Sequence, residues 1–328
     1  MKITCHNKDC KFQFEYNGNE MWTDCPKCSS KVIIKETNSR EDNNSRFRNY
    51  LRNWVRKHPK YNPYNFSKDD ILGKITSKYR LLPDFLIFGE AKCGTNSLCA
   101  NLIEHPKIPP FSRGIHFFDA AFDNGVGWYK QNFPPKWKKK DQLNGESSPY
   151  LNYPHSAKRV FSVVPDVKLV AILRNPIDRA YSSWKMETEF GYENLSFEEG
   201  IKEEENRIGK EIEKVLENEN YWSLPLFRYS YLERGKYAKN LKSWFEIFPK
   251  DQFLIISSED FSSKPQETVN NIFQFLNLST HTIRNLEKKN VRKAAKMNEK
   301  TRNELIEFFK PHNERLFKMI NKKFDWDK

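Results

Sequence analysis

The sequence predicts an α/β fold with a central parallel sheet, joined to a small cysteine-rich N-terminal domain. Two short apolar runs, Phe85–Phe88 and Val167–Leu173, have the continuous hydrophobicity of strands that are buried on both faces. A helix-like segment follows each run, as in strand–helix–strand units, whose crossovers are right-handed. Four cysteines lie within the first 28 residues, in two pairs.

The N-terminal cysteines have the spacing of a metal site. Cys5 and Cys10 form one pair, and Cys25 and Cys28 form the other. Four thiolates suit a tetrahedral zinc ion, and alternating aromatic residues with an Asn-Gly turn predict short strands between the pairs. Residues 1–36 therefore resemble a zinc ribbon, in which the metal supplies the folding free energy that so short a domain lacks. Unligated cysteines and a bound iron ion are the alternatives.

Residues 37–80 are expected to form a linker and a basic amphipathic helix. The segment 36–44 is polar, as linkers are. From Arg46 to Lys60, basic residues alternate with apolar residues at helical spacing. This helix either packs on the following domain or serves as an arm that binds an anion or nucleic acid.

Length and charge limit the class of protein. The chain has 328 residues, of which 38% are hydrophobic, so residues 81–328 can bury the core of one large domain. The 56 Lys and Arg residues exceed the 43 Asp and Glu residues, and the net charge of +13 favours anionic partners. No stretch has the apolar length of a leader or of a membrane span. We therefore expect a cytoplasmic protein with reduced thiols.

The segment 84–98 carries the strongest functional signal. Gly89 and Gly94 allow a tight turn after the first predicted strand, and a polar helix start follows at 95–97. The N–H groups of such a turn and of the helix N-terminus form a cradle for phosphate. The turn is not a Walker A motif, because that motif needs Gly-Lys followed by Ser or Thr to hold magnesium. Here Lys92 stands two residues before the glycine.

A second anion site is predicted at the end of the strand 167–173. Arg174 follows this strand, and Pro176 opens a helix in which Ser182 lies about two turns along. Arg174, Ser182 and the helix N-terminus can bind one phosphate group. Because ligands of open parallel sheets bind beyond the carboxyl ends of the strands, we expect both anion sites in one cleft.

Both sites resemble those of sulfotransferases that use 3′-phosphoadenosine 5′-phosphosulfate (PAPS). The loop around Lys92 resembles their 5′-phosphosulfate loop, and Arg174 with Ser182 matches their 3′-phosphate site, which separates PAPS users from kinases. The resemblance covers residues 81–317 and implies a P-loop-like domain of three layers. The cofactor-binding residues that it implies are Lys92, Cys93, Gly94, Thr95, Asn96, Ser97, Arg174, Ser182, Arg292 and Lys293.

The segment 113–119 resembles the heparan sulfate branch of that family. Its His-Phe-Phe-Asp run matches, but the glutamate that acts as general base in the branch falls on Gly114. His116 is then the remaining candidate for the base that removes a proton from the attacking hydroxyl. The alternative is a histidine that only hydrogen-bonds structure or acceptor. Asp119 is expected to orient His116, to bind the acceptor or to cap the next segment.

The segment 144–150 is similar to the Glu-Lys-Thr-Pro segment of the family, which lies near the transfer site. The supporting lysine falls on Ser147, which weakens an assignment to glycosaminoglycans, whereas many bacterial members read Glu-x-Ser-Pro. The candidate acceptor-binding residues are Asp119, Glu146 and Ser148. A buried structural carboxylate is an equal interpretation of Glu146.

The rest of the chain predicts further helices and one strand. Ser196 and Glu199 form a capping box that opens one charged helix reaching Leu216. Beyond it we expect a helix that ends at Pro249, a strand at 252–256, and helices at 265–278 and 297–320.

The sequence thus predicts a sulfotransferase (EC 2.8.2.-) that moves a sulfuryl group from PAPS to an acceptor hydroxyl, or less favourably to an amine. The acceptor would be a carbohydrate, acidic or not, or a small natural product. Lys92 is expected to stabilise the leaving phosphate, and zinc would be structural. Two other classes remain: a divergent P-loop nucleotide kinase, which lacks the magnesium motif, and a zinc-ribbon protein that binds nucleic acid.

Overall fold

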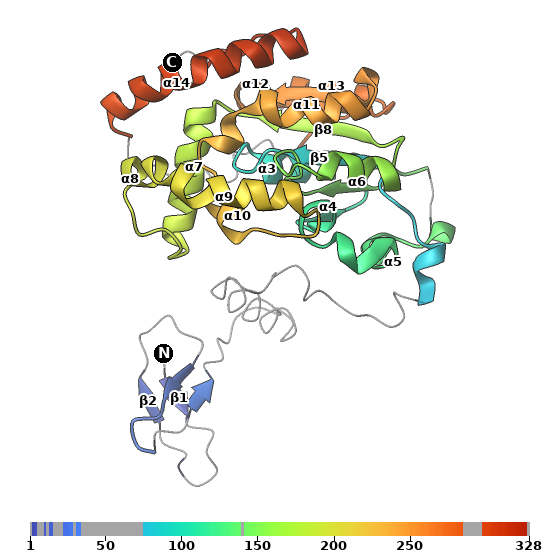
Figure 1. Cartoon of the computed structure of the whole chain (residues 1–328). Coiled ribbons are helices and arrows are strands. Elements are labelled where there is room, and N and C mark those ends of the chain that lie inside the picture. The colour runs from blue at the N-terminus through green and yellow to red at the C-terminus, as the bar shows by residue number, and fades with distance from the viewer. Residues whose placement is uncertain are drawn as a thin grey trace. The chain divides into compact units, whose positions relative to one another are not determined.

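The computed structural model of the chain (Figure 1) describes residues 2–4, 10, 13–15, 22–28, 31–33, 75–138, 141–284 and 297–326. The chain divides into two compact units, Met1–Trp54 and Val55–Lys328. Four predictions fall outside the described residues: the cysteine Cys5, the basic helix within 37–80, and the two basic residues Arg292 and Lys293.

Two antiparallel strand pairs make up the described part of the first unit. They are β1 (Lys2–Thr4) with β2 (Gln13–Glu15), and β3 (Trp22–Asp24) with β4 (Lys31–Ile33). The short strands that the sequence predicts around the cysteines are therefore present. Cys25 directly follows β3 and is buried, whereas Cys28 is exposed.

A five-stranded parallel sheet forms the centre of the second unit, as predicted. From one edge to the other its strands are β6 (Ser112–Arg113), β7 (Gly145–Ser147), β5 (Phe85–Gly89), β8 (Lys168–Leu173) and β9 (Phe253–Ser257). All residues of the central strand β5 are buried. This burial on both faces is what its unbroken apolar run indicates.

Helices cover both faces of the sheet and give the domain three layers (Figure 1). Side chains alternate along a strand, so the odd-numbered residues of β8 enter one core and the even-numbered residues enter the other. The helices of the first core are α4 (Phe117–Ala120), α5 (Gly125–Lys130), α6 (Ser156–Val163), α11 (Tyr237–Ile247) and α14 (Glu299–Ile320). Those of the second are α3 (Thr95–Leu102), α12 (Ser258–Ser263) and α13 (Pro265–Phe275).

Four further helices and five short 3₁₀ turns complete the described part of the second unit. They are α7 (Pro176–Glu189), α8 (Phe197–Lys202), α9 (Glu204–Glu217) and α10 (Leu224–Tyr229), with short 3₁₀ turns η1 (Ser77–Tyr79), η2 (Phe122–Asn124), η3 (Lys136–Lys138), η4 (Glu233–Gly235) and η5 (Lys250–Gln252). The helices α9 and α10 lie side by side (Figure 1). No helix within the described ranges is both long enough and apolar enough to cross a membrane.

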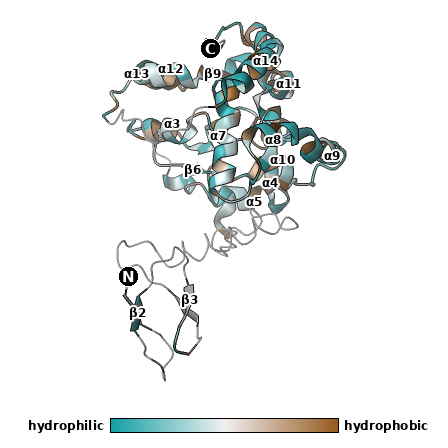
Figure 2. Cartoon of the chain, turned by 90° about the vertical axis from the view of Figure 1, so that its left-hand side faces the viewer, coloured by the Kyte–Doolittle hydropathy of each residue, from teal (hydrophilic) through white to brown (hydrophobic). Residues whose placement is uncertain are grey.

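The single charged helix predicted from Phe197 to Leu216 is two helices. The capping box of Ser196 is present and opens α8, but this helix ends at Lys202, before α9 begins. The two helices serve different cores, because Phe197 packs with α7 and α14 whereas Ile208 and Val215 of α9 pack towards α10. Most of α9 is hydrophilic (Figure 2), and Leu216 is 56% exposed.

Candidate active site

The loop after β5 has the geometry of an anion cradle. Its first residue is anchored, since the N–H of Glu90 donates to the carbonyl of Ile172 at 2.8 Å. Gly94 ends the loop with a φ of 95°, in the left-handed region that favours glycine, and is the N-cap of α3. The N-terminus of α3 begins at Thr95 directly after this loop, and a helix N-terminus favours a bound anion.

The two predicted anion sites meet at Lys92. Its carbonyl oxygen accepts a hydrogen bond from Nη1 of Arg174 at 3.4 Å. Its Nζ lies 3.4 Å from Sδ of Met186 on α7. Met186 lies one turn beyond Ser182, so both residues share a face of this helix. The structure therefore brings Lys92 and Arg174 together, and Ser182 lies one turn before Met186 on α7. Phosphate binding by these residues stays a prediction.

The backbone around Arg174 is held on both sides. Asn175 caps α7 by accepting a hydrogen bond from the N–H of Ile177 at 3.0 Å, and Pro176 occupies the first position of the helix. On the other side, the hydroxyl of Tyr237 donates to the carbonyl of Arg174 at 2.8 Å. A guanidinium on so fixed a backbone is pre-organised for a phosphate.

The side chain of Cys93 points away from the cradle. It is fully buried, with Sγ 3.9 Å from the hydroxyl oxygen of Tyr237. The pKa of the Cys93 thiol is raised to about 12, mainly by burial and secondly by the nearby carboxyl of Glu90. The thiol is therefore protonated at neutral pH and is a poor nucleophile. Only the backbone of Cys93 is placed to contact a cofactor.

His116 and Asp119 form a buried pair. Nδ1 of His116 lies 2.8 Å from Oδ2 of Asp119, and the two residues are each 6% exposed. When Nδ1 carries the proton it donates to Asp119, and Nε2 then has the lone pair that a general base needs. Of the three roles expected for Asp119, this geometry matches the first, which is to orient His116. Gly114, where the related branch has glutamate, has a φ of 67°, at which a glutamate would be strained.

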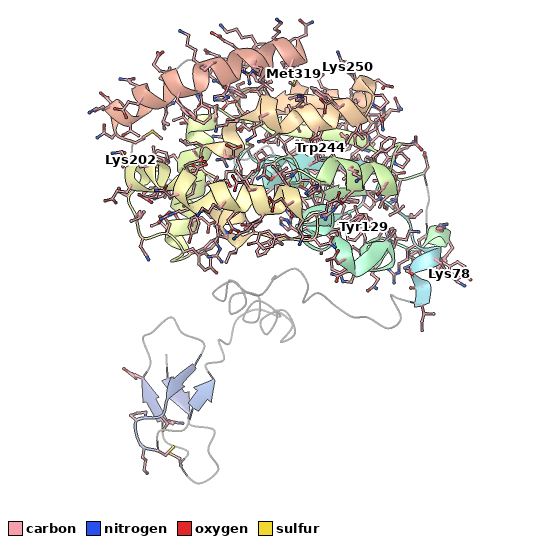
Figure 3. All side chains as sticks on the ribbon, viewed as in Figure 1. Lys78, Tyr129, Lys202, Trp244, Lys250 and Met319 are labelled. Atoms are coloured by element: carbon pink, nitrogen blue, oxygen red, sulfur yellow. The ribbon has the colours of Figure 1, made fainter. Side chains whose placement is uncertain are left out.

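A hydrogen-bond network fixes the segment that carries His116. The carboxylate of Glu146 accepts from the hydroxyls of Tyr129 at 2.6 Å, Ser148 at 2.6 Å and Tyr150 at 2.5 Å; Tyr129 is labelled in Figure 3. Ser148 in turn accepts the N–H of His116 at 3.2 Å. Burial raises the pKa of Glu146, although the three hydrogen bonds oppose this.

Glu146 and Ser148 are thus enclosed rather than open to an acceptor. Their exposed fractions are 0% and 2%. The sequence predicts both as acceptor ligands, with a buried structural carboxylate as the other interpretation of Glu146. This burial favours the structural interpretation: Glu146 holds Ser148, which in turn holds the N–H of His116. Acceptor binding by the two residues stays a prediction.

Backbone strain is clearest at Lys92. In the described part of the chain, the non-glycine residues with positive φ are Lys92 at 73°, His116 at 54°, Asn277 and Asn321. Asparagine and histidine adopt this region several times more often than other residues, whereas lysine rarely does. Such strain persists where the surroundings impose it and gathers at functional sites. Sequence motifs alone gave no signal of this property.

A small cavity of about 10 Å³, room for about one water molecule, lies beside the His116–Asp119 pair. The ring of Phe227 on α10 meets the ring of His116 edge-on, with centroids 5.6 Å apart. Sequence motifs gave no signal for the lining residues at 222–234, because they follow His116 by about a hundred positions and share no motif with it. The lining residues are Asp119, Asn152, Tyr153, Trp222, Ser223, Leu226, Phe227 and Arg234.

The fold places the loop that carries Lys92 and the side chain of Arg174 together at the carboxyl ends of the neighbouring parallel strands β5 and β8. The chain belongs to the sulfotransferase family: the profile of the sulfotransferase domain matches residues 82–328. It is a PAPS-dependent sulfotransferase that catalyses sulfuryl transfer. Family membership excludes the two rival classes, a kinase and a nucleic-acid-binding protein, as the main function.

Known relatives agree with this assignment. The membrane-associated sulfotransferase kil1 of Dictyostelium discoideum is 27% identical over 322 residues, covering 77% of this chain and 68% of that protein. Heparan sulfate glucosamine 3-O-sulfotransferase 6 of Mus musculus is 26% identical over 278 residues, covering 76% and 75%. The crystal structure of a sulfotransferase from Alicyclobacillus acidocaldarius, 30% identical, covers 76% of this chain and all of that one, with a TM-score of 0.60.

Proposed function

We propose that the enzyme transfers the sulfuryl group of PAPS to a hydroxyl group of a carbohydrate or a small molecule. One observation supports the proposal: Nη1 of Arg174 lies 3.4 Å from the carbonyl oxygen of Lys92, so the two predicted anion sites are adjacent. A donor with phosphate groups at both its 3′ and 5′ positions can reach both sites at once. A relative whose name specifies heparan sulfate glucosamine supports a carbohydrate acceptor.

The donor is held at both ends. The loop and first-turn N–H groups from Gly94 to Ser97 bind the 5′-phosphate, and Arg174 with Ser182 binds the 3′-phosphate. Lys92 lies between them and stabilises the negative charge that develops on the leaving phosphate oxygen. Arg292 and Lys293 remain a prediction: they would belong to a loop that closes over the phosphates.

The acceptor hydroxyl attacks in line with the leaving group. Its oxygen forms a bond to sulfur while the bond from sulfur to the phosphate oxygen breaks, which leaves adenosine 3′,5′-bisphosphate (PAP). His116 takes the hydroxyl proton, and Asp119, 2.8 Å from its Nδ1, stabilises the imidazolium that forms. Glu146 and Ser148 hold the histidine backbone in register for this step.

A binding assay followed by an activity assay tests this function. PAP is expected to raise the melting temperature of the protein without added metal, because bound ligand stabilises the native state. A screen of hydroxyl-bearing sugars and phenols with radiolabelled PAPS then identifies acceptors. No thermal shift with PAP would contradict the proposal.

We also infer that the first unit binds a structural zinc ion. The sulfur atoms of Cys10, Cys25 and Cys28 lie within 4.8 Å of one another. The Sγ atoms of Cys10 and Cys25 are 3.8 Å apart, far beyond the ~2.05 Å of a disulfide. Two thiolates on a tetrahedral zinc with bonds of ~2.3 Å would be separated by about this distance. Cys5 is the predicted fourth ligand.

Metal analysis tests the zinc proposal. The full-length protein is expected to carry about one zinc per chain, and Cys25→Ser is expected to lose it. Purified protein without zinc, or with iron in its place, would contradict it. Thiolate ligands of this kind agree with the cytoplasmic location that the sequence predicts, which stays a prediction.

A further inference from the structure

The loop that carries Lys92 begins with a fully buried carboxyl group. Glu90 directly follows β5, and its exposed fraction is 0%. Its Oε1 accepts the N–H of Ala91 at 2.6 Å, and Ala91 precedes Lys92. Burying a carboxylate is costly unless it is paired and hydrogen-bonded. The first turn of the loop therefore depends on Glu90, and Glu90 depends on its partners.

Arg234 supplies the opposite charge for Glu90 from a distant part of the chain. Nη1 of Arg234 lies 3.3 Å from Oε1 of Glu90, the same oxygen that accepts from Ala91. Arg234 is itself buried, with 6% of its surface exposed. Removing one partner of a buried ion pair leaves the other charge uncompensated. The arginine therefore restrains the carboxyl group that holds the loop.

The side chain of Arg234 is held in place by its own surroundings. Its Nη2 donates to the carbonyl of Phe227 at 3.1 Å, and its guanidinium lies 5.5 Å from the centre of the Phe227 ring. The two residues before it are also fixed, because the carboxyl of Glu204 accepts the N–H groups of Leu232 and Glu233 at 2.7 Å each. Arg234 is thus a rigid anchor for the loop.

The turn η4, which contains Arg234, packs against the start of α7. A Cβ atom added to Gly235 would lie 2.9 Å from Cβ of Pro176 and 2.8 Å from the ring of Phe309, so only glycine fits there. Pro176 is the first residue of α7. The ion pair therefore connects the loop to the helix start beside Arg174. Arg174 has a separate anchor, the hydroxyl of Tyr237 on its carbonyl at 2.8 Å.

We propose that Arg234 is a positioning residue for the sulfuryl donor. Through Glu90 it holds the backbone of the loop that carries Lys92 in register with the start of α7. Arg234 thereby sets where the 5′-phosphate binds, whereas the 3′-phosphate site keeps its own anchor at Tyr237. This inference rests on the proposed function, which assigns the loop to the 5′-phosphate.

Two mononucleotides separate this role from a contribution to stability alone. Adenosine 5′-monophosphate and adenosine 3′-monophosphate are titrated calorimetrically into the wild type and into Arg234→Met. We expect the variant to bind the 5′-monophosphate about tenfold more weakly and the 3′-monophosphate within about twofold of the wild type, because only the loop loses its restraint. A residue that only stabilises the fold would lower the melting temperature and would leave the ratio of the two affinities unchanged.

A double variant guards against a loss of folding. Arg234→Met leaves the buried carboxyl of Glu90 without its arginine, which destabilises the native state. Glu90→Gln combined with Arg234→Met removes both charges and keeps an oxygen for the N–H of Ala91. Since residue 90 still lacks its anchor, the double variant should show the same selective loss for the 5′-monophosphate. Circular dichroism checks that it folds. An unchanged ratio of the two affinities in this variant would overturn the inference.

The ion pair of Arg207 and Glu193 provides the matched control. Nη1 of Arg207 lies 2.6 Å from Oε2 of Glu193, which is 3% exposed and accepts the N–H groups of Asn194 and Leu195 at 3.0 Å each. Arg207→Met thus breaks a buried pair of the same design on another loop, and the ratio of the two affinities should not change. A selective loss for the 5′-monophosphate in Arg207→Met as well would overturn the inference.

The order of the titrations separates the two levels of the account. PAP is titrated into the wild type first, and a failure to bind would contradict the proposed function, with which the inference would also fall. If PAP binds to the wild type but the Arg234 variants weaken both monophosphates equally, or neither, the proposed function stands and only the role of Arg234 is refuted.

Discussion

Nη1 of Arg174 donates a hydrogen bond to the carbonyl oxygen of Lys92 at 3.4 Å, although the two residues are 82 positions apart. Lys92 follows the central strand β5, and Arg174 follows its neighbour β8. Parallel pairing brings the carboxyl ends of these strands together, which is where open parallel sheets bind their ligands. The predictions below depend on this arrangement.

Replacing Lys92 should stop transfer without unfolding the protein. We expect Lys92→Ala to lower kcat by roughly 10²–10³, as does the loss of one group that stabilises a developing oxyanion. Steady-state assays with radiolabelled PAPS measure the loss, and circular dichroism checks the fold. Lys250→Ala is the control, because Lys250 is exposed and opens the turn η5, which leads into the amino end of β9. Near-normal turnover in Lys92→Ala would remove the lysine from the mechanism.

Arg174 should discriminate between nucleotides. Arg174→Met is expected to weaken PAP binding by about 10- to 100-fold, the equivalent of one charge-assisted hydrogen bond. Adenosine 5′-monophosphate lacks the 3′-phosphate, so its affinity should stay nearly constant. Isothermal titration of both ligands measures the difference. An equal loss for the two nucleotides would show that Arg174 acts on the loop through Lys92 and not on the 3′-phosphate.

Asp119 and His116 should behave as one unit. Each of the variants Asp119→Asn and His116→Gln is expected to lower kcat by about 10²-fold or more, the usual contribution of general-base catalysis. The double variant should be little worse than His116→Gln alone, because the aspartate acts through the histidine. PAP affinity should stay unchanged in all three. Losses that multiply in the double variant would contradict the pairing seen at 2.8 Å.

Glu204 should make stability depend on pH. Its carboxyl is buried and accepts the N–H groups of Leu232 and Glu233 at 2.7 Å each. Burial raises its pKa from 4.5 to about 7, so the native state holds the proton more tightly than the unfolded state does. This group therefore lowers the free energy of unfolding as the pH rises from 4.5 towards about 7.

The variant Glu204→Gln removes that titration. Its melting temperature relative to the wild type should therefore increase across the same pH interval, as thermal denaturation at several pH values would show. Glu205→Gln is a neighbouring control, because Glu205 is exposed. If the difference in melting temperature between wild type and Glu204→Gln is the same at every pH, Glu204 is not the group that makes stability depend on pH.

Short sequence patterns predicted the strands and helix starts that depend only on neighbouring residues. The unbroken apolar runs gave β5 and β8, and the Asn-Pro pair and the Ser-x-x-Glu box gave the starts of α7 and α8. The break between α8 and α9 was not predictable in this way. It arises because Phe197 and Ile208 enter different cores, which only the tertiary fold defines.

The candidate site likewise has residues that short motifs indicated and residues that they did not. Lys92, Arg174 and the His116–Asp119 pair stand in short motifs, so the sequence indicated them. The ion pair between Glu90 and Arg234 joins residues 144 positions apart, and neither belongs to a binding motif. For Glu146 the sequence left two equal interpretations, an acceptor ligand and a buried carboxylate. It could not choose between them, because burial depends on Tyr129 and Tyr150 around it.

The most direct test of the account is the affinity for PAP compared with the affinities for adenosine 5′-monophosphate and adenosine 3′-monophosphate. All three are titrated calorimetrically in the presence of EDTA. If both anion sites hold one donor, PAP should bind at least about 10²-fold more tightly than either monophosphate, because it alone fills both sites. If PAP binds no more tightly than the better monophosphate, the two sites do not share a ligand, and the account fails.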